Sequence, residues 1–359
     1  MDLKINSIVM LQKGKPILVT GGSGYIASWI IRYLLEEGYE VRATVRKKNG
    51  NSASTEHLNR IGDGTKGKLE LYEADLLKPG SFEKAISGCE VVFHTASPFF
   101  IEKPKNAQKE LVDPALNGTK NVLEAASASG TVKRVVLTSS IVSIMGDASD
   151  ANAIPDKVFN EDHWNDSSSL SHNPYSYSKT LAEKEAWRIA RLQSKWDLLV
   201  INPGFVLGPS LSQRKDSASV DFMISMLNGK YAMGMPNLQF AITDVRDVAT
   251  AHILAAKESG ASGRHIVVSE SLWFSDIITT LKRKYGDTYK FPKSITPNPL
   301  MYVAGPLFGL SWKYLQNNLG YEVRFDNSYS KADLSLTYRP VQETLVDHAE
   351  QIINSGLLE

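Results

Sequence analysis

Residues 16–27 of this 359-residue chain read PILVTGGSGYIA, and this stretch decides the fold class. The apolar run 16–20 predicts a short buried strand that ends in a glycine-rich turn. Apolar residues at helical spacing then occupy 26–37, and Gly38 ends the helix as a C-cap. Glycines let a backbone approach a pyrophosphate, and a helix N-terminus offers free N–H groups and a positive dipole end. The unit predicts a dinucleotide-binding turn; a tight turn with only a structural role is the alternative.

Strand and helix patterns continue to alternate through the first half of the chain. Strands are expected at 41–45, 69–74, 91–95, 134–139 and 197–202, and further helices at 81–87, 111–128 and 174–194. Strands separated by helices in this rhythm predict an α/β fold with a Rossmann-type doubly wound parallel sheet.

The pattern loosens after residue 203, which predicts a smaller C-terminal substrate-binding part within one compact unit. The expected division is an N-terminal extension at 1–15, a dinucleotide-binding core with the catalytic residues at 16–203, and a mostly substrate-binding part at 204–359. Residues 240–256 again show a strand followed by a helix, and we expect them to return to the core.

Composition narrows the class of protein. The formal net charge is +1, which gives no electrostatic reason to expect a nucleic acid or a membrane as partner. The longest apolar runs have the length of strands, and the N-terminal residues lack a signal-peptide pattern. The one cysteine, Cys89, precludes an intrachain disulfide and is expected to be a small buried residue. We therefore expect a cytoplasmic monomer or homodimer. No metal site is expected, because the histidines lack ligand spacing.

The end of the second expected strand discriminates between nicotinamide cofactors. An NAD site usually carries an acidic residue there, which binds the ribose 2′-hydroxyl. Here residues 44–48 read TVRKK, without an acid. Arg46 and a neighbouring lysine can bind a 2′-phosphate through charge-assisted hydrogen bonds. The sequence therefore predicts NADP(H), although a solvated basic strand end is the alternative.

Tyr175 and Lys179 lie four residues apart, so a helix places both groups on one face. A lysine beside a tyrosine favours the phenolate, and shifting a phenol pKa to neutrality requires about 3 units. Such a phenol can give a proton to a carbonyl oxygen or take one from an alcohol. Ser140, which follows the strand expected at 134–139, can hydrogen-bond the same oxygen.

Several further motifs reinforce these assignments. They are VTGGSGYIA at 19–27, VRATVR at 41–46, VFHTASP at 92–98, VLTSS at 136–140, YSYSKTLAE at 175–183, NPGFVLGP at 202–209 and DVRDVA at 244–249. From residue 16 to near the C-terminus, the chain resembles an extended short-chain dehydrogenase/reductase of the dihydroflavonol-reductase-like branch. That branch includes plant dihydroflavonol and cinnamoyl-CoA reductases and microbial aldehyde or ketone reductases. One departure is Ala27, which replaces the third glycine of the usual turn.

The resemblance implies a catalytic triad of Ser140, Tyr175 and Lys179, with Ser139 as the nearest rival and Tyr177 without a lysine at i+4. The residues implied for the cofactor are Gly21, Ser23, Gly24, Tyr25, Ile26, Arg46, Lys47, Asp75, Leu76, Thr95, Ala96, Ser97, Tyr175, Lys179, Pro203, Val206 and Ser219. Within this set, Asp75 and Leu76 match adenine contacts, and Pro203 and Val206 match the nicotinamide wall. Lys47 and Ser219 rest on poorly matching segments.

The expected function is NADPH-dependent, reversible reduction of an apolar or aromatic aldehyde or ketone. The residues expected to line its pocket are Phe99, Phe100, Ile141, Phe205, Phe222 and Met226. A nucleotide-sugar epimerase or dehydratase shares the triad but usually keeps a tightly held NAD. A non-catalytic NADP-sensing regulator is the alternative from another class, and such proteins typically lose the Tyr/Lys pair.

Overall fold

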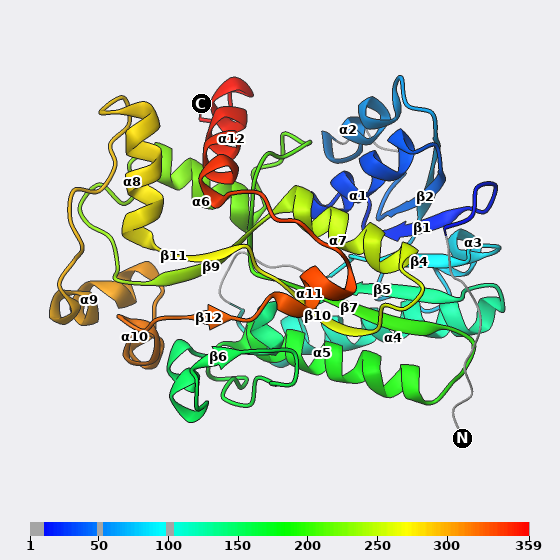
Figure 1. Cartoon of the computed structure of the whole chain (residues 1–359), viewed down its shortest axis with the longest axis horizontal. Coiled ribbons are helices and arrows are strands. Elements are labelled where there is room, and N and C mark those ends of the chain that lie inside the picture. The colour runs from blue at the N-terminus through cyan, green and yellow to red at the C-terminus, as the bar shows by residue number, and fades with distance from the viewer. Residues whose placement is uncertain (1–10, 49–52, 98–103, 359) are drawn as a thin grey trace.

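A seven-stranded parallel sheet forms the centre of the computed structural model, which describes residues 11–48, 53–97 and 104–358 (Figure 1). The order is β10-β7-β5-β4-β1-β2-β3. The bounds of these strands are β1 (Ile17–Thr20), β2 (Glu40–Val45), β3 (Lys68–Glu73), β4 (Val91–His94), β5 (Arg134–Thr138), β7 (Asp197–Pro203) and β10 (Gly263–Val267). The chain builds one half of the sheet from β1 to β3 and then starts the other half at β4. The doubly wound prediction is therefore confirmed, and the strand order reverses between β1 and β4.

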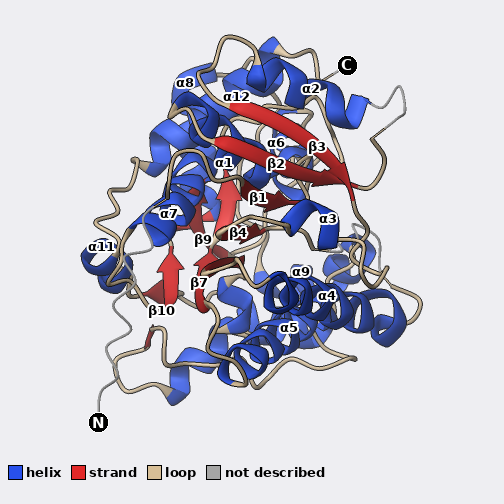
Figure 2. Ribbon diagram, turned by 90° about the vertical axis from the view of Figure 1, so that its right-hand side faces the viewer, coloured by secondary structure: helices blue, strands red, loops and turns tan. Residues whose placement is uncertain are grey.

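Both faces of the sheet are buried, which explains the near-continuous apolar strands. In β1, Ile17 and Val19 belong to one core cluster, whereas Leu18 between them belongs to the other. Helices α1 (Tyr25–Glu36) and α7 (Val245–Lys257) pack together on the first face. Helices α4 (Asp113–Ser129) and α5 (Pro174–Arg191) lie side by side on the second (Figure 2).

The helices depart from expectation in detail. The helix expected at 111–128 begins earlier, with a π-helical turn at η1 (Gln108–Val112) that runs into α4. The short helix α3 (Glu83–Ile86) falls within the range expected for it. Helix α2 (Ala53–Gly62) has no counterpart among the expected elements. Its sequence is mostly polar and its apolar contribution depends on Leu58, which is fully buried in the core cluster beside α1. Tertiary packing therefore stabilises a helix that sequence periodicity marks only weakly.

The C-terminal part forms a separate core beyond β7 (Figure 1). A three-stranded sheet in the order β11-β9-β8 contributes Leu207, Ile242 and Leu272 to this core, most of which comes from helices. A two-stranded sheet joins β12 to β6. The elements of this part and of the loops that meet it are η2 (Ile141–Ser143), η3 (Ala148–Ala153), β6 (Val158–Phe159), β8 (Phe205–Leu207), α6 (Ala218–Leu227), β9 (Gln239–Asp244), β11 (Glu270–Trp273), α8 (Phe274–Tyr285), α9 (Asn298–Ala304), η4 (Gly305–Phe308), α10 (Trp312–Asn318), β12 (Arg324–Phe325), α11 (Ser328–Asp333) and α12 (Val341–Asn354).

Residues 240–256 divide between the two parts. Helix α7 packs against α1, whereas β9 pairs only within the three-stranded sheet. The next strand, β10, extends the central sheet by pairing in parallel with β7. Among the helices in the described ranges, none has both the length and the apolar character that crossing a bilayer requires.

Candidate active site

The glycine-rich turn lies where the strand order reverses, between the carboxyl ends of β1 and β4. Gly21 has a φ of 65°, and a Cβ on it would lie 2.9 Å from Ala96 Cα. A Cβ on Gly22 would lie 2.7 Å from the Cβ of Ala43 on β2. Gly24 is the N-cap of α1 and provides no side chain to cap the helix. The first N–H groups of α1 therefore remain available to an anion, and this donor set fits a dinucleotide pyrophosphate.

Polar side chains hold the turn against the loop that follows β4. Thr20 Oγ1 accepts a hydrogen bond from the Ala96 amide at 3.1 Å and lies 2.9 Å from His94 Nδ1. Thr95 Oγ1 donates to the Thr20 carbonyl at 2.5 Å. Burial, followed by repulsion from Lys179, lowers the pKa of His94 to about 3. His94 is therefore neutral at physiological pH, and its contact with Thr20 gives it a structural role.

The remaining residues implied for the cofactor follow the ends of neighbouring strands. Arg46 and Lys47 are exposed directly after β2. Asp75 and Leu76 follow β3, and Asp75 Oδ1 accepts a hydrogen bond from the Leu77 amide at 2.9 Å. The structure thus brings these groups to the same sheet edge as the glycine-rich turn.

On the other side of the turn, Tyr25 donates through its hydroxyl to the carbonyl of Gly208, just beyond β8. Its neighbour Ile26 lies in the first turn of α1. Pro203 ends β7 and Val206 lies in β8. Ser219 is buried at the start of α6, and its side chain makes no hydrogen bond to the residues that the structure describes. Its assignment to the cofactor stays a prediction.

Helix α5 carries Tyr175 and Lys179 on one face, as their spacing predicted. Pro174 occupies the first helical turn, a position where its missing N–H costs nothing. Lys179 Nζ lies 5.9 Å from the centroid of the Tyr175 ring and donates to Ser97 Oγ at 2.9 Å. Lys179 therefore joins the proton-donor candidate to the loop after β4.

The expected depression of the phenol pKa is wrong for the protein alone. Burial raises the pKa of Tyr175 to about 12. Burial also lowers the pKa of Lys179 to about 8, against the opposing attraction of Glu183. Desolvation of the buried phenolate is thus the cause of the shift at Tyr175. At neutral pH Tyr175 holds its proton, which is the state that a proton donor needs.

The two serines after β5 have different surroundings. Ser139 is buried and donates to the Glu183 carboxylate. Within the described part of the chain, the side chain of Ser140 makes only long contacts: its Oγ lies 3.5 Å from the Pro203 carbonyl and 3.3 Å from the Val142 amide. Ser139 is therefore committed to a structural acceptor, whereas the hydroxyl of Ser140 is the more available to a ligand.

The sequence did not predict a buried ion pair that lies behind the site. Glu183 Oε1 lies 2.6 Å from Arg264 Nε, and both side chains are buried. Glu183 Oε2 accepts further hydrogen bonds from Ser143 at 2.5 Å and Asn202 at 2.8 Å. The pair therefore joins α5 to β7 and β10. Only the position of Glu183, one helical turn after Lys179, could have indicated it.

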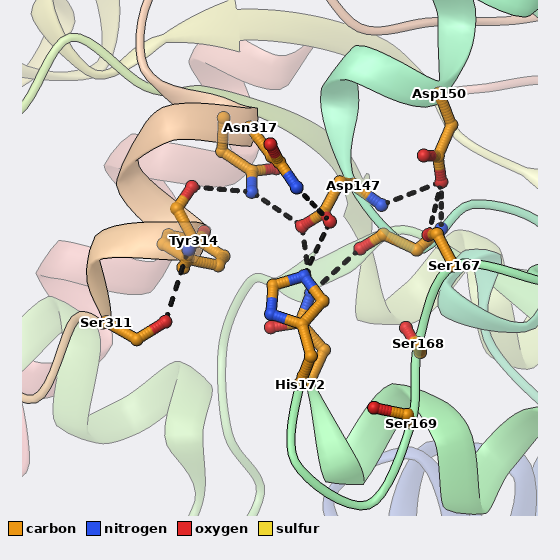
Figure 3. Close-up of polar contacts among 12 residues, drawn as sticks. Asp147, Asp150, Ser167, Ser168, Ser169, His172, Ser311, Tyr314 and Asn317 are labelled. Carbon is orange, nitrogen blue, oxygen red and sulfur yellow. Dashed lines mark hydrogen bonds and ion pairs between the residues drawn. The ribbon is translucent and has the colours of Figure 1, made fainter.

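A second buried carboxylate, Asp147, holds the N-terminus of α5 against α10 (Figure 3). His172 Nε2 lies 2.6 Å from Asp147 Oδ2, and Asn173 donates to Oδ1 at 2.9 Å. From α10, Asn317 and Asn318 donate to Asp147 at 2.9 and 2.8 Å. Burial opposes ionisation, but these hydrogen bonds outweigh it and lower the pKa of Asp147. The segment that positions Tyr175 is therefore fastened to the C-terminal part.

The residues expected to line an apolar pocket differ in accessibility. Phe205 and Phe222 are partly buried and pack edge to face, with ring centroids 5.1 Å apart. Ile141 is buried and Met226 is fully buried within the C-terminal core. The expectation that Met226 forms pocket surface is therefore wrong, because helix α6 turns it inward. Phe99 and Phe100 lie outside the described residues.

Residues 17–269 match the model of the NAD dependent epimerase/dehydratase family. The chain belongs to this family. The predicted resemblance to extended short-chain dehydrogenase/reductases is thereby confirmed.

Relatives and solved structures narrow the branch within this family. Cinnamoyl-CoA reductase CAD2 of Medicago truncatula is 42% identical over 274 residues, which cover 76% of this chain and 81% of that protein. Gre2 from Candida albicans, solved in complex with NADPH, has a TM-score of 0.77 and 29% identity over 95% of this chain and 99% of that one. Yeast methylglyoxal/isovaleraldehyde reductase Gre2, also complexed with NADPH, has a TM-score of 0.75 and 27% identity over 96% and 100% of the two chains.

Proposed function

We propose that this chain is an NADPH-dependent carbonyl reductase that acts on apolar or aromatic aldehydes or ketones. The observation that carries the proposal is the position of Lys179, which lies 5.9 Å from the Tyr175 ring and donates to Ser97 in the loop that packs against the glycine-rich turn. The names of its relatives, a cinnamoyl-CoA reductase and a methylglyoxal/isovaleraldehyde reductase, support a carbonyl substrate.

Each residue of the site has a distinct role in the proposed reaction. NADPH, when bound, supplies the hydride. Tyr175 holds its proton at neutral pH and gives it to the carbonyl oxygen as negative charge develops there. Ser140 donates a hydrogen bond to the same oxygen. Lys179 provides a positive charge beside Tyr175 and orients the cofactor ribose from its place at Ser97.

One arrangement on the sheet edge supports NADPH over NADH, and a second serves the pyrophosphate that both cofactors share. Arg46 follows β2 at the position where an NAD site carries an acid, and it is exposed there. The pyrophosphate is assigned to the first turn of α1, where Gly24 leaves the N–H groups uncapped.

The test is the rate of NADPH oxidation with a panel of aldehydes, ketones and diketones, repeated with NADH. We expect turnover to be fastest with apolar or aromatic carbonyls and kcat/KM to favour NADPH. A protein that retains NAD during purification and converts nucleotide sugars without net cofactor consumption would be an epimerase or dehydratase instead. Binding of NADPH without turnover of any carbonyl would support the regulator alternative.

Exchanging each serine for alanine separates their roles. Ser140→Ala is expected to lower kcat by roughly 10²-fold, the typical effect of losing one donor to a developing oxyanion, with little change in melting temperature. Ser139→Ala removes a donor to the buried Glu183 carboxylate and is expected to cost about 1–3 kcal/mol of stability. Steady-state kinetics and thermal unfolding of both variants measure this. The reverse pattern would make Ser139 the active serine.

A further inference from the structure

The loop between β8 and α6 brings an arginine to the glycine-rich turn from 191 residues further along the chain. Arg214 Nη1 lies 3.3 Å from Ser23 Oγ and 3.4 Å from the Ser23 carbonyl oxygen, to which it donates. Arg214 matches none of the motifs that point to cofactor binding. Its position nevertheless places a guanidinium directly beside the turn.

The base of this loop is anchored to α1. Tyr25 donates to the carbonyl of Gly208, and Trp29 Nε1 donates to the carbonyl of Pro209 at 2.8 Å. The amide of the next residue, Ser210, donates to Gln351 Oε1 on α12 at 3.0 Å. Helix α1 therefore fixes residues 208 and 209 and helix α12 fixes residue 210, so the base of the loop that carries Arg214 is anchored at both helices.

Arg214 is paired with a carboxylate from its own loop. Its Nε donates to Asp216 Oδ1 at 2.8 Å, and Nη2 donates to Oδ2, which makes the pair bidentate. The side chains of Arg214 and Asp216 are 28% and 58% exposed. An ion pair this exposed contributes little net stability, because water competes for both charges.

A second basic group acts on the same carboxylate. The hydrogen bond from Arg214 is the largest cause that lowers the pKa of Asp216, and the charge of Arg46 contributes as well. Arg214 and Arg60 also act on His57 of α2, whose pKa falls to about 4 mainly through burial. Asp216 is thus paired with the guanidinium beside Ser23, and it also feels the charge of Arg46 at the end of β2.

We propose that Arg214 binds the 2′-phosphate of NADP(H) together with Arg46. In the absence of cofactor Asp216 pairs with Arg214, and the bound 2′-phosphate displaces it. The inference rests on the proposed use of NADPH. A phosphate monoester carries a charge of about −1.5 to −2 and three acceptor oxygens, against one charge and two oxygens for a carboxylate. Exchange of one anion for the other therefore favours the phosphate.

The test measures dissociation constants of NADPH and NADH by titration of the full-length protein, without turnover. Arg214→Ala is expected to weaken NADPH binding by roughly 10- to 100-fold, as for loss of hydrogen bonds to a charged group. NADH binding should change little. Arg46→Ala should behave in the same way, and Lys215→Ala, an exposed neighbour in the same loop, is the matched control.

Asp216→Asn gives a prediction of the opposite sign. Because it removes the competing anion, NADPH should bind about two- to fivefold more tightly, within the range of an exposed ion pair, and NADH should be unaffected. The same difference is expected with 2′,5′-ADP against 5′-ADP as probes. Weaker NADPH binding by Asp216→Asn, with unchanged thermal unfolding, would overturn the displacement.

The outcomes keep this inference distinct from the proposed function. If the wild-type protein binds NADH as tightly as NADPH, the assignment of NADPH fails. If the wild-type protein prefers NADPH but Arg214→Ala binds both cofactors normally, only the role of Arg214 fails. Thermal unfolding of each variant without cofactor shows whether a loss of binding reflects a loss of folding.

Discussion

Tyr175→Phe is expected to lower carbonyl turnover by about 10²- to 10⁴-fold, the usual contribution of a positioned proton donor. The substitution removes the phenolic hydroxyl and leaves the ring, so its packing on α5 beside Lys179 should persist. Because the glycine-rich turn and Arg46 are untouched, the dissociation constant for NADPH should stay within a few-fold of the wild-type value. Single-turnover NADPH oxidation and a binding titration measure the two quantities.

Tyr177→Phe is the matched control for this experiment. Tyr177 lies on the same helix two residues further along, on a different face from Lys179. Its hydroxyl is expected to be dispensable, with turnover close to that of the wild-type protein. Unchanged turnover in Tyr175→Phe would disprove the assigned proton donor, and a loss in Tyr177→Phe alone would transfer the role to that residue.

Glu183→Ala is expected to lower the free energy of unfolding by about 3–5 kcal/mol, because removing one partner leaves the other charge buried and uncompensated. The other charge is Arg264, whose guanidinium lies 2.6 Å from Glu183 and 3.9 Å from the ring centroid of Trp164. Arg264 also donates to the carbonyls of Glu161 and His163, at 2.8 and 2.6 Å. Equilibrium denaturation in urea measures the effect.

Two further variants decide whether the effect comes from the buried charge. Glu185→Ala removes the carboxylate of an i,i+3 pair with Arg188 on the solvent side of the same helix, and its cost should be below about 1 kcal/mol. A double variant, Glu183→Met with Arg264→Leu, should recover much of the stability that Glu183→Ala loses, since no charge stays buried. Equal losses in Glu183→Ala and Glu185→Ala would contradict the role assigned to the pair.

Two buried carboxylates, Glu183 and Asp147, show how the position of the site depends on the rest of the fold. Glu183 fastens the middle of α5 to the central sheet, and Asp147 fastens the N-terminus of α5 to α10 of the C-terminal part. Helix α5 therefore has a fixed position between both parts of the molecule. A reacting carbonyl needs such precision, because small displacements of a catalytic group cost rate.

Much of the fold follows from local patterns in the sequence. The run 16–27 predicts β1, the turn and α1, because strand and helix periods are local properties of the chain. The same locality places Tyr175 and Lys179 on one helix face. Prediction from local patterns fails for α2, because its single deeply buried leucine leaves almost no helical period to detect.

The candidate site is predicted only in part, because its energetics depend on burial and on distant residues. The sequence alone determined the α/β class, the glycine-rich turn between β1 and α1, the missing acid after β2 and the spacing of the Tyr/Lys pair. The tertiary structure decided that Tyr175 keeps its proton, that Ser140 rather than Ser139 is available, and that Glu183 meets Arg264. It also brought Arg214 to Ser23. A pKa depends on how much solvent the whole fold excludes, and a long-range contact depends on how distant segments pack. No local spacing in the sequence carries that information.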